Sequence, residues 1–247
     1  MTQIMGIVNV TPDSFSDGGK YFSPEEAVRR AHNLLREGAD MIDFGAESTR
    51  PGATPLSWEQ EWSRLEPVLE RFFASPVRGP QPIVSIDTYH PETARRAIGM
   101  GAAIANCVYP EPVPDMIALV REFPQAQLVM PAKCRSLVDG DPELMSRIYL
   151  DPMIGFGTTR EEDLELLRSV PELAKKARVL IGASRKRIVK KLTGEKVTGK
   201  NLGGNLGIAV WCAMHGASAV RVHDVRETYQ AIKVVGTISG EVSMEEV

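Results

Sequence analysis

Short apolar runs alternate along this chain with longer segments that have helical periodicity. The first run, Ile4–Val8, ends at Asn9, where a polar loop rich in Asp, Ser and Gly begins. An apolar run of this length that ends in a polar loop is typical of a buried parallel strand whose carboxyl end faces a ligand site. The loop alone could equally be an ordinary strand–helix connection, but the same order of run, polar residues and helix recurs down the chain.

The recurring pattern predicts eight strands with helices between them. Their expected ranges are Ile4–Val8, Met41–Phe44, Ile83–Ile86, Ala103–Ala105, Gln127–Met130, Ile148–Leu150, Val179–Ile181 and Ser218–Val220. Because no linker-like stretch interrupts the alternation, residues 1–247 are predicted to form a single-domain α/β fold, a TIM (β/α)8 barrel. A doubly wound open sheet is the alternative, but no G-x-G-x-x-G motif follows the first strand to support it.

The first predicted helix has clear boundary signals. Ser23 and Pro24 suit an N-cap and a first helical residue, and Gly38 is placed to end the helix. Further helices are expected over Ser57–Phe73, Pro91–Met100, Asp115–Glu122, Glu161–Leu167 and Leu206–His215.

Length and composition agree with a barrel and exclude other classes. The chain has 247 residues, which is within the roughly 200–250 residues over which α/β barrels form one domain. Its formal charge is −3 and its basic residues form no long cluster, so nucleic acid is not an expected partner. No apolar run approaches the ~18 residues of a membrane span. The scattered cysteines Cys107, Cys134 and Cys212 lack metal-ligand spacing, and we expect structural thiols in a cytoplasmic protein.

Candidate chemistry gathers where the predicted strands end. One polar residue there is more simply a helix N-cap, but several at corresponding positions converge on the carboxyl-terminal rim of a barrel, where active sites lie. Part of the set suits a flat, nitrogen-rich heterocycle and part, together with Arg50, suits phosphate. We therefore expect an enzyme for a small anionic molecule with a polar ring. The strand-end residues are Asn9, Asp43, Asp87, Asn106, Asp151, Lys186, Arg221 and His223.

Six motifs in this order resemble the dihydropteroate synthase family across nearly the whole chain. They are MGIVNVTPDSFSDGG, DFGAESTRPGA, VSIDTYHPE, DPMIGFG, GASRKR and VRVHDV. The resemblance implies a TIM barrel, usually homodimeric, that acts as a transferase of folate biosynthesis. Such enzymes join 4-aminobenzoate to 6-hydroxymethyl-7,8-dihydropterin diphosphate and release diphosphate, with Mg²⁺ as cofactor.

The resemblance also implies roles for individual residues. A pterin pocket would consist of Asp87, Asn106, Asp151 and Lys186. Diphosphate would be held by Asn9, Arg221 and His223, with Asn9 also a ligand of Mg²⁺. Aminobenzoate would contact Phe15, Ser48, Thr49, Arg50, Pro51 and Ser184. The residues implied in catalysis are Asp17, Lys186, Arg221 and His223, with Asp17 and Asp151 stabilising a cationic pterin.

Four departures from the family pattern leave alternatives open. The fifth strand ends Met130-Pro131-Ala132-Lys133, where a His- and Met-containing motif that packs on the pterin is usual. Cys107 stands where an Asp usually follows the fourth-strand Asn and faces the pterin, and Thr158 stands where a Lys usually follows GFG. The segment from Met130 to Asp151 is about half the usual length, so the fifth βα unit is predicted to be short or without a helix. A diverged, non-catalytic pterin-binding paralogue is therefore the main alternative. A pterin-dependent methyltransferase is disfavoured, because those proteins lack the Ser-Arg-Lys element and the Arg-x-His strand end.

Overall fold

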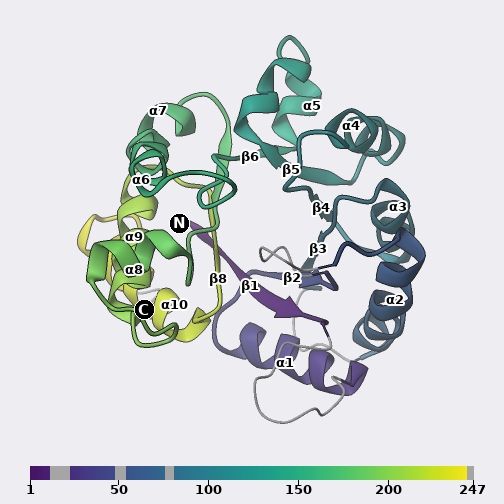
Figure 1. Ribbon diagram of the computed structural model, residues 1–247, viewed down its shortest axis with the longest axis horizontal. Helices are drawn as coiled ribbons and strands as arrows, with labels where there is room; N and C mark the ends of the chain where they lie inside the picture. Colours follow the sequence, from purple (N-terminus) through teal and green to yellow (C-terminus); the bar gives the residue numbers. More distant parts are fainter. Residues whose placement is uncertain (12–22, 48–53, 76–80, 244–247) are drawn as a thin grey trace.

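A computed structural model describes residues 1–11, 23–47, 54–75 and 81–243, and its eight strands form a closed parallel barrel in chain order (Figure 1). Strand β1 pairs with both β2 and β8, which closes the barrel. The predicted TIM barrel is confirmed, and each predicted strand is present with ends that differ by at most two residues. The strands are β1 Gln3–Asn9, β2 Met41–Gly45, β3 Ile83–Asp87, β4 Ile104–Asn106, β5 Gln127–Pro131, β6 Ile148–Asp151, β7 Arg178–Ile181 and β8 Ala219–Val222.

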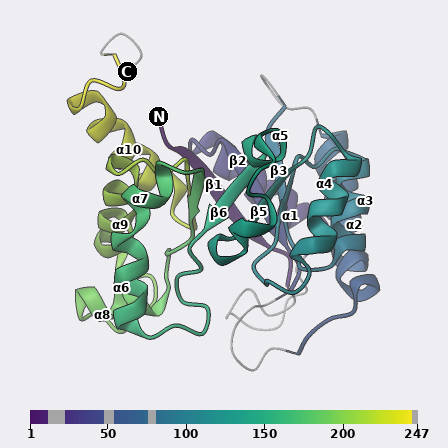
Figure 2. The same cartoon turned by 90° about the horizontal axis from the view of Figure 1, so that it is seen from above.

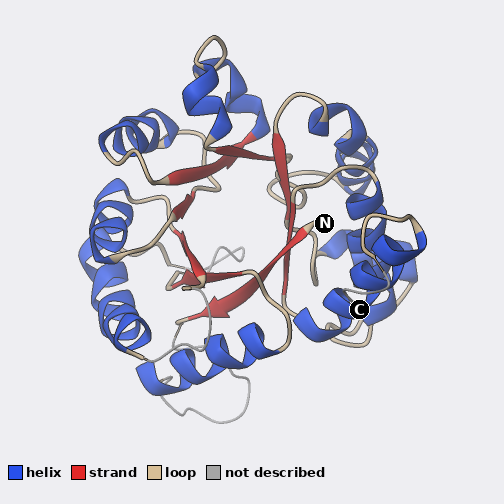
Figure 3. Cartoon of the chain, turned by 180° about the vertical axis from the view of Figure 1, so that it is seen from behind, coloured by secondary structure: helices blue, strands red, loops and turns tan. Residues whose placement is uncertain are grey.

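Helices surround the barrel on all sides (Figure 3). Seen from above, α6, α8, α9 and α10 cover one side and α2, α3 and α4 the other (Figure 2). Within the described part of the chain, no helix is long and apolar enough to cross a membrane. The helices are α1 Pro24–Arg36, α2 Trp58–Ala74, α3 Pro91–Met100, α4 Val113–Glu122, 3₁₀ helix η1 Ala132–Leu137, α5 Pro142–Ser146, α6 Arg160–Arg168, α7 Val170–Ala174, α8 Arg187–Thr193, α9 Leu202–Met214 and α10 Val225–Ile238.

Capping side chains fix the starts of several of these helices. The Ser23 hydroxyl accepts a hydrogen bond from the Glu26 N–H, and the Glu26 carboxylate accepts one from the Ser23 N–H, which satisfies two backbone donors at the start of α1. The same reciprocal arrangement begins α2 at Ser57 and α6 at Thr159. The predicted stop at Gly38 is confirmed, since this residue has φ +105°, a conformation that favours glycine.

The unit after β5 is short, as predicted from its length. The η1 turn and the five-residue helix α5 replace the long helix that covers the other strands. They still bury Cys134 and Leu144 against the outside of β5 and β6, so this side of the barrel keeps an apolar cover. The three helices α7, α8 and α10 were not predicted.

The side chains inside the barrel form an apolar layer beneath a polar layer. The apolar layer includes Met41, Ile104, Tyr149 and Ala219. Because successive inward-facing residues of a strand are two positions apart, the next inward position on each strand lies closer to the carboxyl-terminal rim. The residues at these positions are Asp43, Asn106, Asp151 and Arg221.

Candidate active site

A guanidinium lies at the centre of the polar layer and joins three strands. Arg221 on β8 donates from Nε to Asp43 Oδ2 and from Nη2 to Asp87 Oδ2, both at 2.6 Å. Asn106 on β4 donates from Nδ2 to the same Asp43 oxygen at 3.2 Å. Asp43 and Asn106 are fully or almost fully buried, so these contacts hold the strand ends in a fixed arrangement. Asp43 faces the site but had no implied role in the sequence.

The carboxylate of Asp87 has two opposing influences on its ionisation. Burial raises the pKa of Asp87, and the neighbouring Arg221 guanidinium opposes that rise. Burial also raises the pKa of Asp151 on β6, and the nearby Lys186 ammonium opposes that rise. Burial is the larger influence, so the pKa of both carboxyls is raised overall, while the adjacent cation favours the charged form that accepts hydrogen bonds from ring N–H groups of a ligand.

Lys186 reaches this site from the loop that follows β7. A Cβ atom placed on Gly182 would lie 3.8 Å from Asp151 Oδ2 and 3.9 Å from Lys186 Nζ, so both groups border the space that this glycine leaves open. Nζ donates to the Ile154 carbonyl at 2.6 Å. Burial lowers the pKa of Lys186 to about 8, and Asp151 opposes the shift. The lysine is thus a cation at neutral pH that can lose its proton under mildly alkaline conditions.

His223 forms a separate pair with Ser184 at the end of β8. The His223 backbone N–H donates to Ser184 Oγ at 3.3 Å, and that hydroxyl lies 3.1 Å from His223 Nδ1. Either the hydroxyl donates to Nδ1 and the ring proton is on Nε2, or Nδ1–H donates to the hydroxyl, according to the tautomer of the ring. Burial lowers the pKa of His223 to about 3, and the charges of Arg185 and Arg221 add to the effect. His223 is therefore uncharged at neutral pH, with one ring nitrogen a donor and the other an acceptor.

Asn9 ends β1 at the same rim and is exposed. Its backbone pairs with Gly45 of β2, while its amide oxygen is a hard, neutral donor open to solvent. Among the described residues, no group of three or more His, Cys, Asp or Glu side chains is arranged to hold a metal ion. A single oxygen ligand still fits Mg²⁺, which keeps most of its waters and is commonly bound through substrate phosphates.

The structure thus brings most of the predicted site residues to one rim. Asp87, Asn106, Asp151, Lys186 and Arg221 are linked by contacts or by close charge interactions, and His223 interacts electrostatically with Arg221. Ser184 lies against His223. The remaining predicted residues lie outside the described part of the chain: Phe15, Asp17, Ser48, Thr49, Arg50 and Pro51.

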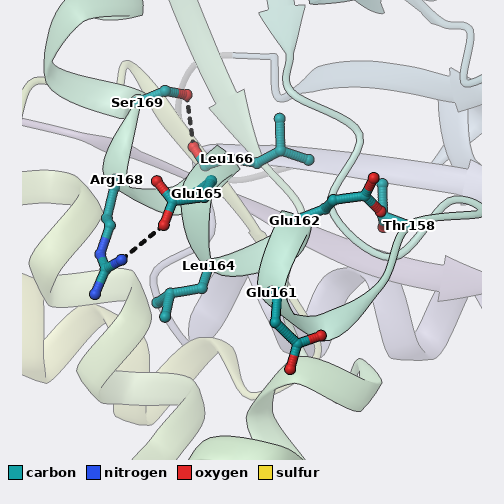
Figure 4. Close-up of a pocket in the computed structure, with 8 residues that line it drawn as sticks. All are labelled: Thr158, Glu161, Glu162, Leu164, Glu165, Leu166, Arg168 and Ser169. Atoms are coloured by element: carbon teal, nitrogen blue, oxygen red, sulfur yellow. Dashed lines mark hydrogen bonds and ion pairs between the residues drawn. The ribbon is translucent and has the colours of Figure 1, made fainter.

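A surface hollow along α6 is a second place where a ligand could bind, and its chemistry is unsuitable. Figure 4 shows it lined by Glu161, Glu162 and Glu165, together with Leu164, Leu166 and other residues of the helix. Three carboxylates with no cation except Arg168, which is paired to Glu165, would repel a phosphorylated substrate. The rim of the barrel therefore remains the candidate site.

Comparison with known proteins identifies the family. Residues 5–146 and 141–223 match the family model described as pterin binding enzyme. The dihydropteroate synthase of Staphylococcus haemolyticus is 36% identical over 245 residues, which cover 91% of this chain and 90% of that protein. The chain belongs to the dihydropteroate synthase family.

Solved structures agree with this assignment. A dihydropteroate synthase from Clostridium difficile, determined in the presence of pteroic acid, has a TM-score of 0.85 at 31% identity and covers 96% of both chains. The Xanthomonas albilineans synthase with 4-aminobenzoic acid has a TM-score of 0.82 at 35% identity, covering 96% of this chain and 93% of that one. The shortened unit after β5 therefore leaves the family's barrel intact.

The side chain of Cys107, one of the departures from the dihydropteroate synthase pattern, does not face the site as expected. Cys107 was predicted to face the pterin, but its side chain is 1% exposed and packs in the apolar cluster between β4 and the helices α3 and α4. Its thiol contacts the Tyr109 carbonyl oxygen at 3.2 Å, and burial raises the pKa of the thiol to about 12. Cys107 is thus an inert packing residue, and Asn106 beside it is the one that faces the site.

Two carboxyls near the site were not identified from the sequence. Glu61 on α2 is fully buried and accepts a hydrogen bond from Thr88 Oγ1 at 2.6 Å, directly beside Asp87. Glu47, after β2, accepts from the Leu56 N–H and from the Tyr89 hydroxyl. Both lie in segments whose polar residues fit an ordinary solvent-exposed face or loop, so only the packing of α2 and the β3 loop reveals them.

Proposed function

We propose that this protein is a working dihydropteroate synthase that condenses 6-hydroxymethyl-7,8-dihydropterin diphosphate with 4-aminobenzoate and releases diphosphate. The observation that supports it best is the cluster of Asp87, Asn106, Asp151 and Lys186 around Arg221 at one rim of the barrel. This set offers acceptors and donors for a flat pterin ring in a chain whose relatives are dihydropteroate synthases.

The residues proposed to bind the pterin and those proposed to bind the diphosphate would both assist the breaking of the C–O bond. The C–O bond between the pterin methylene and the diphosphate breaks, the amine of aminobenzoate forms a C–N bond to the same carbon, and that nitrogen loses a proton. Asp151, with Asp17 from the first loop, would stabilise positive charge on the pterin as the C–O bond lengthens. No covalent intermediate with the protein is needed, which agrees with the inert environment of the cysteines.

Negative charge on the leaving diphosphate would develop beside His223, a neutral hydrogen-bond donor, and Arg221, a cationic one. His223 would donate from Nε2 in the tautomer whose Nδ1 accepts from Ser184, and Arg221 keeps N–H donors in addition to the two that it gives to Asp43 and Asp87. Asn9 would share Mg²⁺ with the diphosphate, and the cation would supply Lewis-acid stabilisation of the leaving oxygens. Aminobenzoate would contact Ser184, together with the loop residues Phe15, Ser48, Thr49, Arg50 and Pro51.

We also propose that the protein is a cytoplasmic homodimer. The exposed side chains Met214 on α9 and Val234 and Ile238 on α10 are apolar, and Ile238 is 82% exposed. A second copy would remove such surface from water. Light scattering during size-exclusion chromatography would give twice the chain mass of 27.1 kDa for a dimer, whereas the mass of one chain would exclude it.

Turnover with both substrates tests the proposed function. The purified protein with Mg²⁺, the pterin diphosphate and 4-aminobenzoate is expected to form dihydropteroate, identified by its mass, with one diphosphate released per product. Omission of aminobenzoate should abolish the product, and chelation of Mg²⁺ should slow its formation. Binding of the pterin without product from any combination of substrates would favour the non-catalytic paralogue.

A further inference from the structure

The ammonium of Lys186 is held by a loop and not by a strand. Nζ donates to the Ile154 carbonyl at 2.6 Å and lies 4.2 Å from the centre of the Phe156 ring. Between these two residues, Gly155 has φ +81°, and a Cβ there would lie 3.1 Å from the Lys186 side chain. The position of the ammonium therefore depends on the shape of the segment that connects β6 to α6.

A fully buried carboxylate on α6 fixes the shape of that segment. Asp163 Oδ1 accepts from the Gly155 N–H at 2.7 Å and from the Thr158 hydroxyl. Arg160 also joins Asp163 to this segment. Its Nη1 lies 2.5 Å from Asp163 Oδ2, and its Nη2 donates to the Thr158 carbonyl at 2.6 Å. Thr158, which departs from the family pattern, is thus part of a connected network with Asp163.

We propose that Asp163 is a positioning residue for Lys186, acting through the β6–α6 loop and through its own negative charge. The proposal rests on the proposed function, in which Lys186 binds the pterin. Asp163 contacts Gly155, Thr158 and Arg160, so the effect proposed on the substrate is indirect. The Ile154 carbonyl and the Gly155 N–H belong to one planar peptide unit. The hydrogen bond from this N–H to Asp163 therefore also fixes the direction of the carbonyl toward Nζ.

Charge is the second part of the effect. The charged groups that act on Lys186 are Asp151 from β6, Asp87 from β3, Arg221 from β8 and Asp163 from α6. Burial and Arg221 lower the pKa of Lys186, while Asp163 and the other two carboxylates raise it. Neutralising Asp163 therefore lowers this pKa below about 8, and the lysine loses its proton at a lower pH.

Two substitutions separate geometry from charge. Asp163→Asn keeps an oxygen that can accept from Gly155 and Thr158 but removes the charge, whereas Asp163→Ala removes both. Glu165→Gln is the matched control, since Glu165 lies on the same helix with its side chain 70% exposed and paired to Arg168 (Figure 4). The assay is kcat/KM for the pterin diphosphate between about pH 6 and about pH 10, at saturating aminobenzoate.

Each variant has a distinct expected result. Asp163→Asn should move the alkaline limb of the profile to lower pH by roughly half a unit to one unit. Asp163→Ala should reduce kcat/KM for the pterin diphosphate by about ten- to a hundredfold, as expected when a buried network loses its acceptor, with the KM for aminobenzoate unchanged. Glu165→Gln should match the wild type.

An alkaline limb of Asp163→Asn that coincides with the wild type would overturn the proposal. If Asp163→Ala does not fold, Asp163→Asn alone decides the outcome. A wild type that forms no dihydropteroate would contradict the proposed function, not this inference. In that case, the affinity for 6-hydroxymethylpterin over the same pH range replaces the rate, with the same shift expected in Asp163→Asn and its absence contradicting the role of Asp163.

Discussion

At the scale of single residues, Arg221 has a structural role as well as its proposed role toward diphosphate. Its guanidinium is the counter-charge of Asp43 and Asp87, and Asp43 is fully buried. Removing one partner of a buried ion pair leaves an uncompensated charge, which is far more costly than losing an exposed pair. The site cannot therefore lose this arginine without a loss of fold stability.

Arg221→Ala should lower the free energy of unfolding by about 3–5 kcal/mol at pH 8. The loss should be smaller at pH 5, because the pKa of the abandoned Asp87 is already raised by burial and protonation relieves its unpaired charge. Urea unfolding at both pH values measures the difference. Arg185→Ala is the control: this arginine pairs with Asp224, its side chain is 36% exposed, and its removal should cost about 1 kcal/mol or less. Equal losses for the two variants would contradict the role of Arg221.

Glu61 predicts a second pH dependence. Burial raises its pKa from 4.5 to about 7, so the folded protein keeps a proton that the unfolded chain loses between these pH values. The folded state then binds more protons than the unfolded state, and stability contributed by this group falls as pH rises from 4.5 to about 7. The change above pH 7 is small.

Glu61→Gln should remove that dependence, since the amide can still accept from Thr88 and carries no charge. Chemical denaturation at pH 5 and pH 8 should give a stability difference that is smaller in Glu61→Gln than in the wild type by about 2–3 kcal/mol. Glu59→Gln, on the exposed side of the same helix, should behave as the wild type does. An equal change in stability between pH 5 and pH 8 in the wild type and in Glu61→Gln would show that Glu61 is ionised in the folded state.

The sequence predicted which residues reach the rim better than it predicted their partners. Strand-end position was enough to select Asp87, Asn106 and Asp151, because all strands of a parallel barrel end at one rim. The pairing of Arg221 with Asp43 joins the second and eighth strands, and depends on barrel closure and register that no local pattern contains. Cys107 was assigned to the wrong face because a one-residue step along the chain moves a side chain from the inside of the barrel to the outside.

At the scale of secondary-structure elements, boundaries marked by side-chain caps were predictable. Ser23 and Gly38 delimit α1 as expected. The helices α8 and α10 were not predicted, and each begins at a residue whose side chain makes no capping hydrogen bond, Lys186 and Asp224. The five-residue helix α7 is too short to show periodicity. These helices pack on the barrel or on neighbouring helices, α7 on β7, α10 on β1 and α9, and α8 on α6 and α9, which a pattern of single residues does not report.

The turn after α1 offers a direct test at this scale. Gly38 combines φ +105° with close packing: an added Cβ would lie 2.6 Å from the Tyr229 ring of α10. Gly38→Ala should therefore lower stability by about 2–4 kcal/mol through both backbone strain and overlap. In Gly99→Ala, at the end of α3, nothing lies within 4 Å of the new methyl group, and stability should rise by about 0.5–1 kcal/mol. Thermal unfolding measures the stability of both variants. A Gly38→Ala protein that is as stable as Gly99→Ala would contradict the prediction.

At the scale of the whole molecule, barrel closure converts distant sequence positions into one site. The inward step from Met41 to Asp43 and from Ala219 to Arg221 changes the barrel interior from apolar to polar on opposite ends of the chain. The apolar layer supports the strands, and the polar layer faces the open rim. The barrel stays closed with its shortened unit after β5, so the two layers are preserved.

The most direct test of a pterin site at this rim is calorimetric titration of 6-hydroxymethylpterin into the wild type and Asp151→Asn. We predict binding by the wild type and a loss of about ten- to a hundredfold in affinity for Asp151→Asn, because a buried charged acceptor of the pterin is removed. Glu165→Gln, at the surface of α6, should bind as the wild type does. Equal affinity of Asp151→Asn and the wild type, with both proteins folded, would contradict a pterin site between the strand ends.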